Sequence, residues 1–385
     1  MTAESPMLVI AALIAEAGGE GLHACMQCGT CTGVCPWPTV EQLSPRLILR
    51  QASLGLEGWE EEQVWRCVTC RACEDRCPRG IEITEVMRAA RSVVQESGGA
   101  PRGLSGPLAS LRTNGNPWEG ESTERAVWMK TLGVPSWEPA CEALLVPCCT
   151  QVHEARNRRA SRALVGLLHR AGVRFGTLSE GMQCCGDQAR KVGAEDVYQQ
   201  VNDANLRTYR QNAIERMWVA SPHCLNVLRA QQDAPASEHY TEVLWRLVEQ
   251  ERLHPSRSCD EVVTYHDPCY LGRWAGVYDA PRRTLEAIPG LELREMPRNR
   301  EESFCCGGGG GGLWQELPIE QRFAVHRVRE ALETGARVLV TACPYCVLMF
   351  EDAIKVLELE DELQVRDVAE VLAHAVGVDA PEATP

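Results

Sequence analysis

The sequence of 385 residues has no uninterrupted apolar run near the ~18 residues that a membrane span needs. The N-terminal segment 1–19 has a short apolar run but no Lys or Arg before it, so it is a poor signal peptide. Positive charge is scarce: 39 Lys and Arg against 53 Asp and Glu give a net charge of −14, which argues against nucleic-acid binding. No phosphate loop or flavin signature is present, so hydride chemistry must belong to another subunit. These absences predict a cytoplasmic chain without a membrane span of its own.

Cysteine, in contrast, is abundant. The chain has 20 cysteines in an otherwise ordinary globular composition that is 44% hydrophobic and 24% charged. Structural disulfides are rare in the cytosol, where clustered cysteines usually hold metal. A chain of this length is expected to form two to three domains, and the cysteine spacing indicates where they lie.

Two cysteine runs of identical spacing lie near the start of the chain. They cover 25–36 and 67–78, and both read C-x2-C-x2-C-x3-C-P. Two-cluster bacterial ferredoxins hold cubane [4Fe–4S] clusters with this run, in which three thiolates serve one cube and the fourth serves the other. One cluster is therefore expected on Cys25, Cys28, Cys31 and Cys77. The other is expected on Cys67, Cys70, Cys73 and Cys35.

The alternatives for these runs are zinc knuckles or disulfides. The occurrence of eight cysteines in two runs of the same spacing argues against both. Apolar residues at helical spacing fill the segment between them, where tryptophans are expected in the core. We expect a ferredoxin-type domain over 1–97. The following segment, 98–138, is rich in Gly, Pro, Ser and Asn and is expected to be a linker or wrapping segment.

The remaining two-thirds contain an internal repeat. The motif Cys-Cys-Gly occurs at 184–186 and again at 305–307, an offset of 121 residues. Further cysteines keep nearly the same offset before and after each motif: Cys148 with Cys269, and Cys224 with Cys346. We expect a first repeat domain over 139–255 and a second over 256–385.

Short β-branched runs that end in cysteine alternate with helical patterns along both repeats. Examples are 143–148, 262–269 and 336–343. The fold class predicted is therefore a helical two-cluster ferredoxin domain (α+β) followed by two repeated α/β cysteine-rich domains. Cysteines at the carboxyl ends of neighbouring strands converge at one sheet edge. In the second repeat this edge gathers five thiolates: Cys269, Cys305, Cys306, Cys343 and Cys346.

On these motifs the chain resembles heterodisulfide reductase. The spacing from Cys269 to Cys346 looks like the "CCG" domain of heterodisulfide reductase B, the ferredoxin-type segment resembles heterodisulfide reductase C, and the fused order resembles heterodisulfide reductase D, over roughly 20–375. Components of the sulfite-reductase-associated, glycolate oxidase, anaerobic glycerol-3-phosphate dehydrogenase and benzoyl-CoA reductase systems look similar. In this family a complete CCG motif binds a noncubane [4Fe–4S] cluster, which implies the five second-repeat cysteines as the catalytic site. It also implies a flavoprotein, a membrane cytochrome or other redox subunits as partners, which would bring the chain to the inner membrane face.

The first repeat departs from this pattern, because Ser221 stands where the second repeat has Cys343. A hydroxyl is a poorer iron ligand than a thiolate. Four matching cysteines remain: Cys148, Cys184, Cys185 and Cys224. Cys149, next to the first of them, is available as a substitute ligand. We rank an altered iron–sulfur cluster first, zinc second and an empty structural copy third.

The glycine run 307–312 follows the second Cys-Cys pair. Gly307 and Gly308 are expected to contact the cofactor, since glycine lets the backbone approach a cluster and its N–H groups bond cluster sulfurs. The alternative is a flexible loop. His266 is expected to brace its loop through Asp267 rather than to supply a proton, and no required role is expected for His223.

Two groups of residues receive ordinary roles. Cys141 and Cys259 fall outside the repeat and are expected to be ordinary thiols. Arg273, Arg298 and Arg300 are expected on the solvated surface, with binding of an anionic substrate or partner as the alternative.

Together these features predict an iron–sulfur subunit that passes electrons from a partner through two cubanes to a noncubane cluster. There a disulfide would be reduced or, in reverse, thiols oxidised. The alternative is a non-catalytic electron-relay subunit of a larger complex. A structural zinc protein would leave the eight ferredoxin-type cysteines unexplained.

Overall fold

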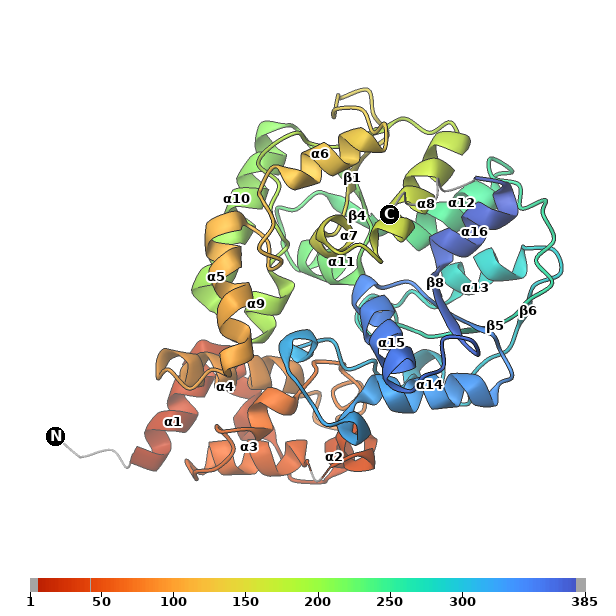
Figure 1. Cartoon of the computed structure of the whole chain (residues 1–385). Helices are drawn as coiled ribbons and strands as arrows, with labels where there is room; N and C mark the ends of the chain where they lie inside the picture. The colour runs from red at the N-terminus through yellow and green to blue at the C-terminus, as the bar shows by residue number, and fades with distance from the viewer. Residues whose placement is uncertain (1–5, 42, 379–385) are drawn as a thin grey trace.

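The computed structural model describes residues 6–41 and 43–378 and arranges them in three parts, coloured from red to blue in Figure 1. The N-terminal part is helical, and the two parts that follow are α/β with one parallel sheet each. This confirms the predicted fold class. Of the helices described, none combines the length and the apolar composition that crossing a membrane requires.

Short helices and the two cysteine loops form the N-terminal part. Its α-helices are α1 (Pro6–Ile14), α2 (Thr30–Val34), α3 (Pro45–Ser53) and α4 (Ile83–Glu96). Ser44 caps α3 by accepting a hydrogen bond from the N–H of Leu47, and proline occupies the first turn. Trp59 and Trp65, from the segment between the cysteine runs, are buried core residues as expected.

The first α/β part has a four-stranded parallel sheet in the order β2-β1-β3-β4. Its strands are β1 (Ala143–Val146), β2 (Phe175–Gly176), β3 (Arg216–Val219) and β4 (Ala236–His239). Its helices are α7 (Cys149–His153), α8 (Arg158–Arg170), α9 (Asp187–Lys191), α10 (Glu195–Gln211), α11 (Pro222–Arg229) and α12 (Tyr240–Glu249). Every residue of β1 is buried, as is usual for a strand covered on both faces.

The second α/β part repeats this order as β6-β5-β7-β8. Its strands are β5 (Val262–Tyr265), β6 (Glu292–Leu293), β7 (Val338–Thr341) and β8 (Gln364–Asp367). Its helices are α13 (Asp279–Glu286), α14 (Phe323–Glu333), α15 (Pro344–Val356) and α16 (Val368–Val376). The equal strand order shows that the internal repeat is a repeat of structure.

Helices also occupy the segment expected to be a linker or wrapping segment. They are α5 (Ser105–Asn114) and α6 (Glu124–Thr131). α5 packs on α10 and α6 packs on α7, so both lie against the first repeat (Figure 1). Farther along, Ser136 forms a parallel bridge with Thr177 beside β2.

Of the three apolar cores among the described residues, one lies within the second repeat and two hold the parts together. One continues from the N-terminal part into the first repeat and includes buried residues of the second. The other lies between the two repeats, where α8 packs on α16 and α12 packs on α13. The cysteine loops of all three parts are thereby directed toward a common junction.

Candidate functional site

The two cysteine runs of the N-terminal part share an unusual backbone. Gln27 and Gly29 of the first run have φ values of +62° and +86°. Thr69 and Arg71 occupy the same positions of the second run and have φ values of +51° and +69°. Left-handed backbone is costly for residues with a Cβ, most of all for β-branched threonine, and such residues cluster at functional sites. The two runs therefore share the same loop conformation.

A small buried cavity lies beside the second run. Four cysteines line it, three from the second run and one from the first: Cys67, Cys70, Cys73 and Cys35. Apolar side chains such as Ile48 and Met87 form much of the remaining wall. Burial raises the pKa of Cys67 and Cys73, so four thiolates here require a cationic metal centre to offset their charge. The donor set and its enclosure fit a [4Fe–4S] cluster.

The other predicted set lies nearer to the surface. Cys28 is exposed and Cys25 and Cys77 are half-buried. The amide of Gln27 donates to Cys25 Sγ at 3.2 Å, and the N–H of Ile81 approaches Cys77 Sγ at 3.5 Å. Donors of this kind typically surround the sulfurs of metal ligands.

The five second-repeat cysteines come together from three loops. Cys269 follows β5, Cys305 and Cys306 follow the loop after β6, and Cys343 and Cys346 lie at the start of α15. The Sγ atoms of Cys269 and Cys305 are 4.0 Å apart, and those of Cys306 and Cys346 are 3.2 Å apart. None of the five is more than 7% exposed. They form an enclosed thiol group at the carboxyl ends of β5 and β7, as predicted for an open α/β sheet.

Hydrogen bonds within this group favour thiolates at two positions. The pKa of Cys306 lies well below its usual range, because hydrogen bonds from Cys305 and Cys346 outweigh burial. Burial acts to raise the pKa of Cys343, but hydrogen bonds from Cys346 and His223 lower it to about 6. Since the thiolate is the metal-binding form of cysteine, this group is suited to hold a cationic centre.

His266 lies against the same cysteines, with a ring nitrogen within 4.8 Å of two of their sulfurs. Its Nδ1 accepts a hydrogen bond from Arg327 Nε at 3.2 Å, and its Nε2 has no hydrogen-bond partner among the described residues. The expected brace through Asp267 is wrong. The Asp267 carboxylate is instead held by both terminal nitrogens of Arg282, at 2.7 Å each.

Arg273 joins the N-terminal part to the second repeat. Its Nε donates to the carbonyl of Cys70 at 2.7 Å, and its Nη1 donates to the carbonyl of Ser303 at 2.8 Å. The expectation of a surface residue is wrong here, because Arg273 is only 8% exposed. Beside it, the Cys70 and Cys305 side chains lie near enough to affect each other's pKa. A ferredoxin-type cysteine and a second-repeat cysteine are thus neighbours.

The other two arginines match the expectation of surface residues. Arg298 pairs with Glu330 at 3.1 Å, and Arg300 pairs with Asp279 at 2.9 Å. The cysteines outside the repeat also lie apart from both thiol groups. Cys259 contacts the carboxylate of Glu261.

The glycine run passes from the second-repeat cysteines to the ferredoxin-type loop. The N–H of Gly307 faces Cys305 Sγ at 3.4 Å. A Cβ on Gly309 would lie 2.5 Å from the carbonyl of Val68, and one on Gly310 would lie 2.4 Å from the carbonyl of Cys67. Glycine is needed because two backbones meet there without room for a side chain. The buried Arg91 of α4 closes this junction by donating to the carbonyls of Cys67 and Gly310.

The first repeat also gathers its cysteines. All five candidates lie at the loops after β1 and β3 and at the first Cys-Cys pair: Cys148, Cys149, Cys184, Cys185 and Cys224. Cys149 Sγ lies 3.5 Å from Cys184 Sγ, so the cysteine proposed as a substitute is within the group. Ser221 instead caps α11, where its Oγ accepts from the N–H of His223 at 3.3 Å.

His223 reaches across to the other repeat, which sequence reasoning did not foresee. Its Nδ1 lies 2.8 Å from a carboxylate oxygen of Asp187, and its ring packs 3.9 Å from Tyr270 and 4.6 Å from Tyr345. It also lies near enough to Cys343 of the second repeat for the two groups to affect each other's pKa. His223 and Tyr345 occupy equivalent positions in the two repeats. This equivalence was the available signal for their contact, because equivalent residues of two similar domains can meet where the domains pack on each other.

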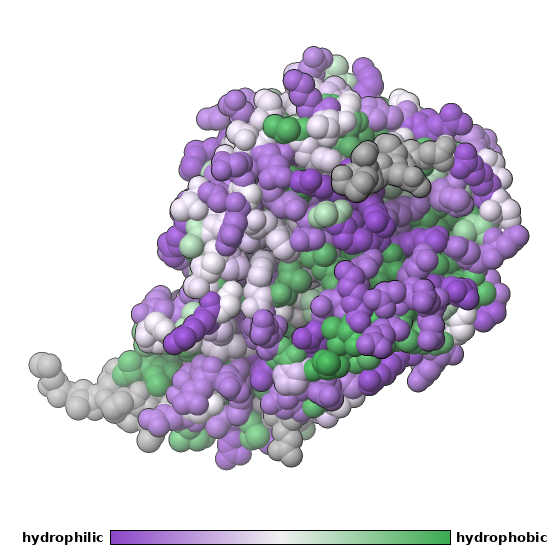
Figure 2. Space-filling model, viewed as in Figure 1, coloured by the Kyte–Doolittle hydropathy of each residue, from purple (hydrophilic) through white to green (hydrophobic). Residues whose placement is uncertain are grey.

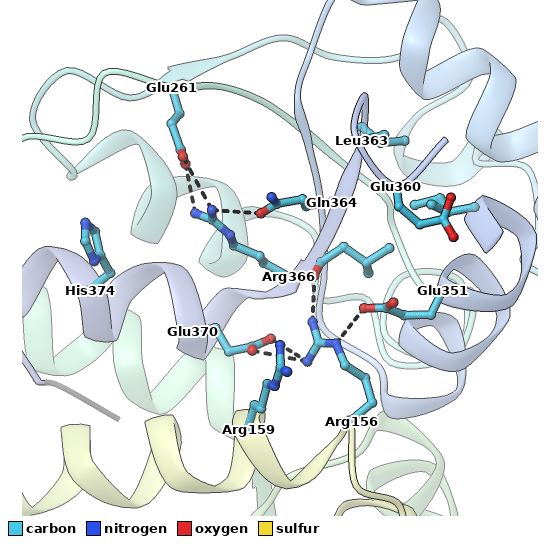
Figure 3. Close-up of a pocket in the computed structure, with 12 residues that line it drawn as sticks. Arg156, Arg159, Glu261, Glu351, Glu360, Leu363, Gln364, Arg366, Glu370 and His374 are labelled. Carbon is cyan, nitrogen blue, oxygen red and sulfur yellow. Dashed lines mark hydrogen bonds and ion pairs between the residues drawn. The ribbon is translucent and has the colours of Figure 1, made fainter. Parts of the chain in front are cut away.

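A separate cavity of about 540 Å³ lies between the repeats but has no cysteine in its wall (Figure 3). Arg156 donates there to Glu351 at 2.6 Å and to Glu370 at 3.1 Å, and Arg366 pairs with Glu261 at 2.9 Å. These opposite charges largely neutralise one another. The bonds of Arg156 therefore join the two repeats, and the cavity beside them is not part of the thiol sites.

Comparison with known protein families identifies the same three parts. Residues 21–81 match the 4Fe-4S dicluster domain, and residues 143–229 and 263–351 each match the Cysteine-rich domain. The D component of the dihydromethanophenazine:CoB–CoM heterodisulfide reductase of Methanosarcina barkeri is 28% identical over 93% of this chain and 94% of its own length. The chain thus combines a 4Fe-4S dicluster domain with two Cysteine-rich domains, and it is similar to heterodisulfide reductase D over most of its length. Its domain composition confirms the predicted iron–sulfur electron-transfer protein of the oxidoreductase type.

Two other relatives of this heterodisulfide reductase D-like chain are longer. The probable iron-sulfur-binding oxidoreductase FadF of Bacillus subtilis is 31% identical over 92% of this chain, and the EtfAB:quinone oxidoreductase of Syntrophomonas wolfei is 32% identical over 92% of it. The chain spans 60% and 58% of their respective lengths.

Proposed function

We propose that this chain relays electrons from a redox partner to the second-repeat cysteines, where a disulfide is reduced to two thiols or the reverse takes place. The reduction consumes two electrons from the partner and two protons from solvent. When bound, iron–sulfur clusters supply the one-electron steps of such a path. The two crossed sets of four ferredoxin-type cysteines would hold cubanes, and the five second-repeat cysteines would hold a noncubane cluster beside Gly307 and Gly308.

The observation that carries this proposal is the link that the buried Arg273 makes between the two ligand groups. Its guanidinium donates to the carbonyl of Cys70 on one side and to the carbonyl of Ser303, two residues before Cys305, on the other. Ligand groups that belong to different parts of the chain are thus held next to each other without a mobile segment between them. This arrangement suits electron transfer from the N-terminal part into the second repeat.

The exposed end of the path would receive the partner. Cys28 is exposed, whereas the second-repeat cysteines are enclosed. Relatives include a component of a reductase and an oxidoreductase named for a quinone. We therefore propose a flavoprotein, a membrane cytochrome or another redox subunit as the partner at the Cys28 side.

A non-catalytic relay is the second candidate. The enclosure of all five second-repeat cysteines and the loss of a thiolate at Ser221 favour it, because substrate chemistry requires access to a cluster. In this case the first repeat would hold an altered cluster or zinc on Cys148, Cys149, Cys184, Cys185 and Cys224.

Low-temperature EPR with iron and zinc analysis on anaerobically purified protein separates the two candidates. Disulfide chemistry predicts two cubane signals plus an oxidised-state signal that shifts when thiol is added and disappears in Cys305→Ser. The matched variant Cys149→Ser, in the first repeat, should leave the thiol-sensitive signal intact. If only cubane signals are seen, and neither added thiol nor Cys305→Ser changes them, the disulfide reaction is rejected and the non-catalytic relay is supported.

A further inference from the structure

Seven arginines and lysines are buried within the described part of the chain, although hydrophilic residues otherwise dominate the face of the molecule in Figure 2. Four of the seven pair with a carboxylate at 2.7 to 2.9 Å: Arg88, Lys191, Arg282 and Arg327. The other three form no ion pair among the described residues: Arg91, Arg125 and Arg273. A buried cation without an opposite charge is costly, so these three arginines require a compensating anion.

Two of the unpaired arginines bond the second cysteine run directly. Arg91 Nη2 donates to the carbonyl of Cys67 at 2.5 Å, and Arg273 Nε donates to the carbonyl of Cys70 at 2.7 Å. Arg91 is completely buried, and Arg273 Nη2 has no hydrogen-bond partner among the described residues. A guanidinium keeps its proton even when it is buried. Two full positive charges therefore lie against the inner set, which is Cys67, Cys70, Cys73 and Cys35.

The third unpaired arginine has the same relation to the first repeat. Arg125 Nη1 donates to the carbonyls of Met182 and Gln183, at 2.9 and 3.0 Å, directly before Cys184. Each unpaired buried cation of the described residues thus bonds the backbone of a cysteine loop. Four thiolates outweigh the core charge of a cubane, so a loaded loop is an anion. The loaded centres would supply the negative charge that these arginines lack.

The carboxylates of the second run do not offset the two arginines. Arg71 pairs with Glu74 and with Asp75, at 3.1 Å each, and the hydroxyl of Thr84 also donates to Glu74 at 2.6 Å. Arg71 balances one of these two charges. The other, on Asp75, belongs to a side chain that is 32% exposed, where water and salt screen it. The charges of Arg91 and Arg273 are therefore left for the inner set.

The outer set, which is Cys25, Cys28, Cys31 and Cys77, lacks such buried cations. None of the three unpaired arginines donates to its loops, and the donor to Cys25 Sγ is the neutral amide of Gln27. Arg46 lies beside Gly29 of this loop, but it is only half-buried and Cys28 is exposed, so solvent screens charge there. Reduction adds negative charge, which buried cations stabilise more than screened ones do.

We propose that Arg91 and Arg273 are the counter-charges of the inner set and make its centre the more easily reduced of the two cubanes. Electrons that enter near Cys28 would then collect at the centre beside the second repeat. The proposal rests on the two cubanes of the proposed function, but it does not depend on the disulfide reaction.

A redox titration of the anaerobic, cluster-loaded chain, followed by EPR, tests the assignment. Two cubane reduction steps are expected. Arg91→Gln should disfavour the step of higher potential roughly tenfold or more, where tenfold corresponds to about 59 mV, and should leave the other step in place. Arg273→Gln should move the same step in the same direction. Arg91→Lys and Arg273→Lys keep the charge and should shift it less than the glutamine variants.

Arg125→Gln is the matched control, because it removes an equally buried cation at the first repeat and should leave both cubane steps in place. Iron content and EPR intensity establish that each variant is folded and loaded, and the Arg273 variants decide the matter if Arg91→Gln does not load. A shift of the lower-potential step, or no shift of either step, would overturn the proposal.

Equal shifts in the lysine and glutamine variants, or an equal shift in Arg125→Gln, would also overturn it, because the cause would then not be local charge. These outcomes leave the relay itself intact. Absence of two cubane steps from the unmodified chain would instead reject the ligand sets of the proposed function together with this proposal. Thiol-insensitive EPR combined with the expected shifts would reject only the disulfide reaction.

Discussion

The two cysteine-rich repeats have the same strand order but make different contacts at their Cys-Cys-Gly motifs. In the first repeat the chain turns directly into α9 after Gly186. In the second, the glycines after Gly307 carry the backbone against the carbonyls of Cys67 and Val68. The repeat whose loop meets the ferredoxin-type loop is also the one that has a cysteine at every motif position, whereas the first repeat has Ser221 at one of them. The two repeats therefore share a strand order, and they differ in that the Cys-Cys-Gly loop of the second repeat packs directly on the backbone of the ferredoxin-type loop.

The replacement of a cysteine by Ser221 removes one thiolate from the first repeat. Ser221 and Cys343 begin equivalent helices, α11 and α15. The serine oxygen accepts from the helix N–H of His223, whereas Cys343 makes no side-chain cap bond. The hydroxyl therefore stabilises the helix end by about 1 kcal/mol, while the sulfur remains available for iron.

Making the second repeat resemble the first should have the largest effect. Cys343→Ser removes a thiolate from the enclosed group, and we expect loss of the noncubane signal together with roughly four iron atoms per chain. Iron analysis and EPR measure this. Ser221→Ala is the control in the first repeat: it should cost about 1 kcal/mol of stability but no iron. Full iron and an unchanged thiol-sensitive signal in Cys343→Ser would show that five cysteines are not required.

The reverse change sharpens the comparison. Ser221→Cys supplies the first repeat with a fifth thiolate at the position of Cys343, and we expect its metal spectrum to shift toward that of the second repeat. EPR of oxidised protein before and after anaerobic reconstitution with iron and sulfide records the shift. An unchanged spectrum, with zinc or no metal in the first repeat, would mean that more than the missing ligand separates the copies.

Much of this comparison could be predicted from the sequence, because cysteine spacing is local and its chemistry is restrictive. The runs at 25–36 and 67–78, the repeat and the departure at Ser221 were all evident. The cross-links between parts were not. Arg273 bonds a carbonyl about 200 residues away, and the partners of His266 and His223 depend on how helices from separate parts pack. Such contacts leave no periodic pattern, so each residue alone resembles an ordinary surface or bracing side chain.

Arg273 allows the link between the parts to be broken without touching a cysteine. Arg273→Met leaves the carbonyls of Cys70 and Ser303 without their buried charged donor, and we expect unfolding free energy to fall by about 2–4 kcal/mol. Electron transfer into the second repeat should also slow. Arg300→Met is the matched control, because its ion pair with Asp279 is at the surface and contributes about 0–1 kcal/mol. Urea unfolding and freeze-quench EPR measure the two effects, and equal losses for both variants would argue against a special role for Arg273.

The smallest expected effect concerns the N-caps of α12 and α16, which are His239 in the first repeat and Asp367 in the second. Each forms a capping box with a glutamate three residues later. The two repeats therefore start these helices in the same way but with different titratable side chains. Burial, and then Glu370, raises the pKa of Asp367 to about 7. Burial, and then Arg229, lowers the pKa of His239 to about 3.

The two caps should therefore respond to pH with opposite sign. An unfolded aspartate has a pKa near 3.9, so folded Asp367 binds more protons than the unfolded chain between about pH 4 and pH 7, and its contribution to stability falls as pH rises. An unfolded histidine has a pKa near 6.5, so folded His239 binds fewer protons between about pH 3 and pH 6.5, and its contribution rises with pH. Measured by urea unfolding from about pH 5 to pH 7, the stability of Asp367→Asn relative to the unmodified chain should increase with pH, on the order of 1 kcal/mol per pH unit, and that of His239→Asn should decrease. Parallel slopes for the two variants would show that the caps share an electrostatic environment, and the repeats would then differ at their cysteine loops and not at these helix ends.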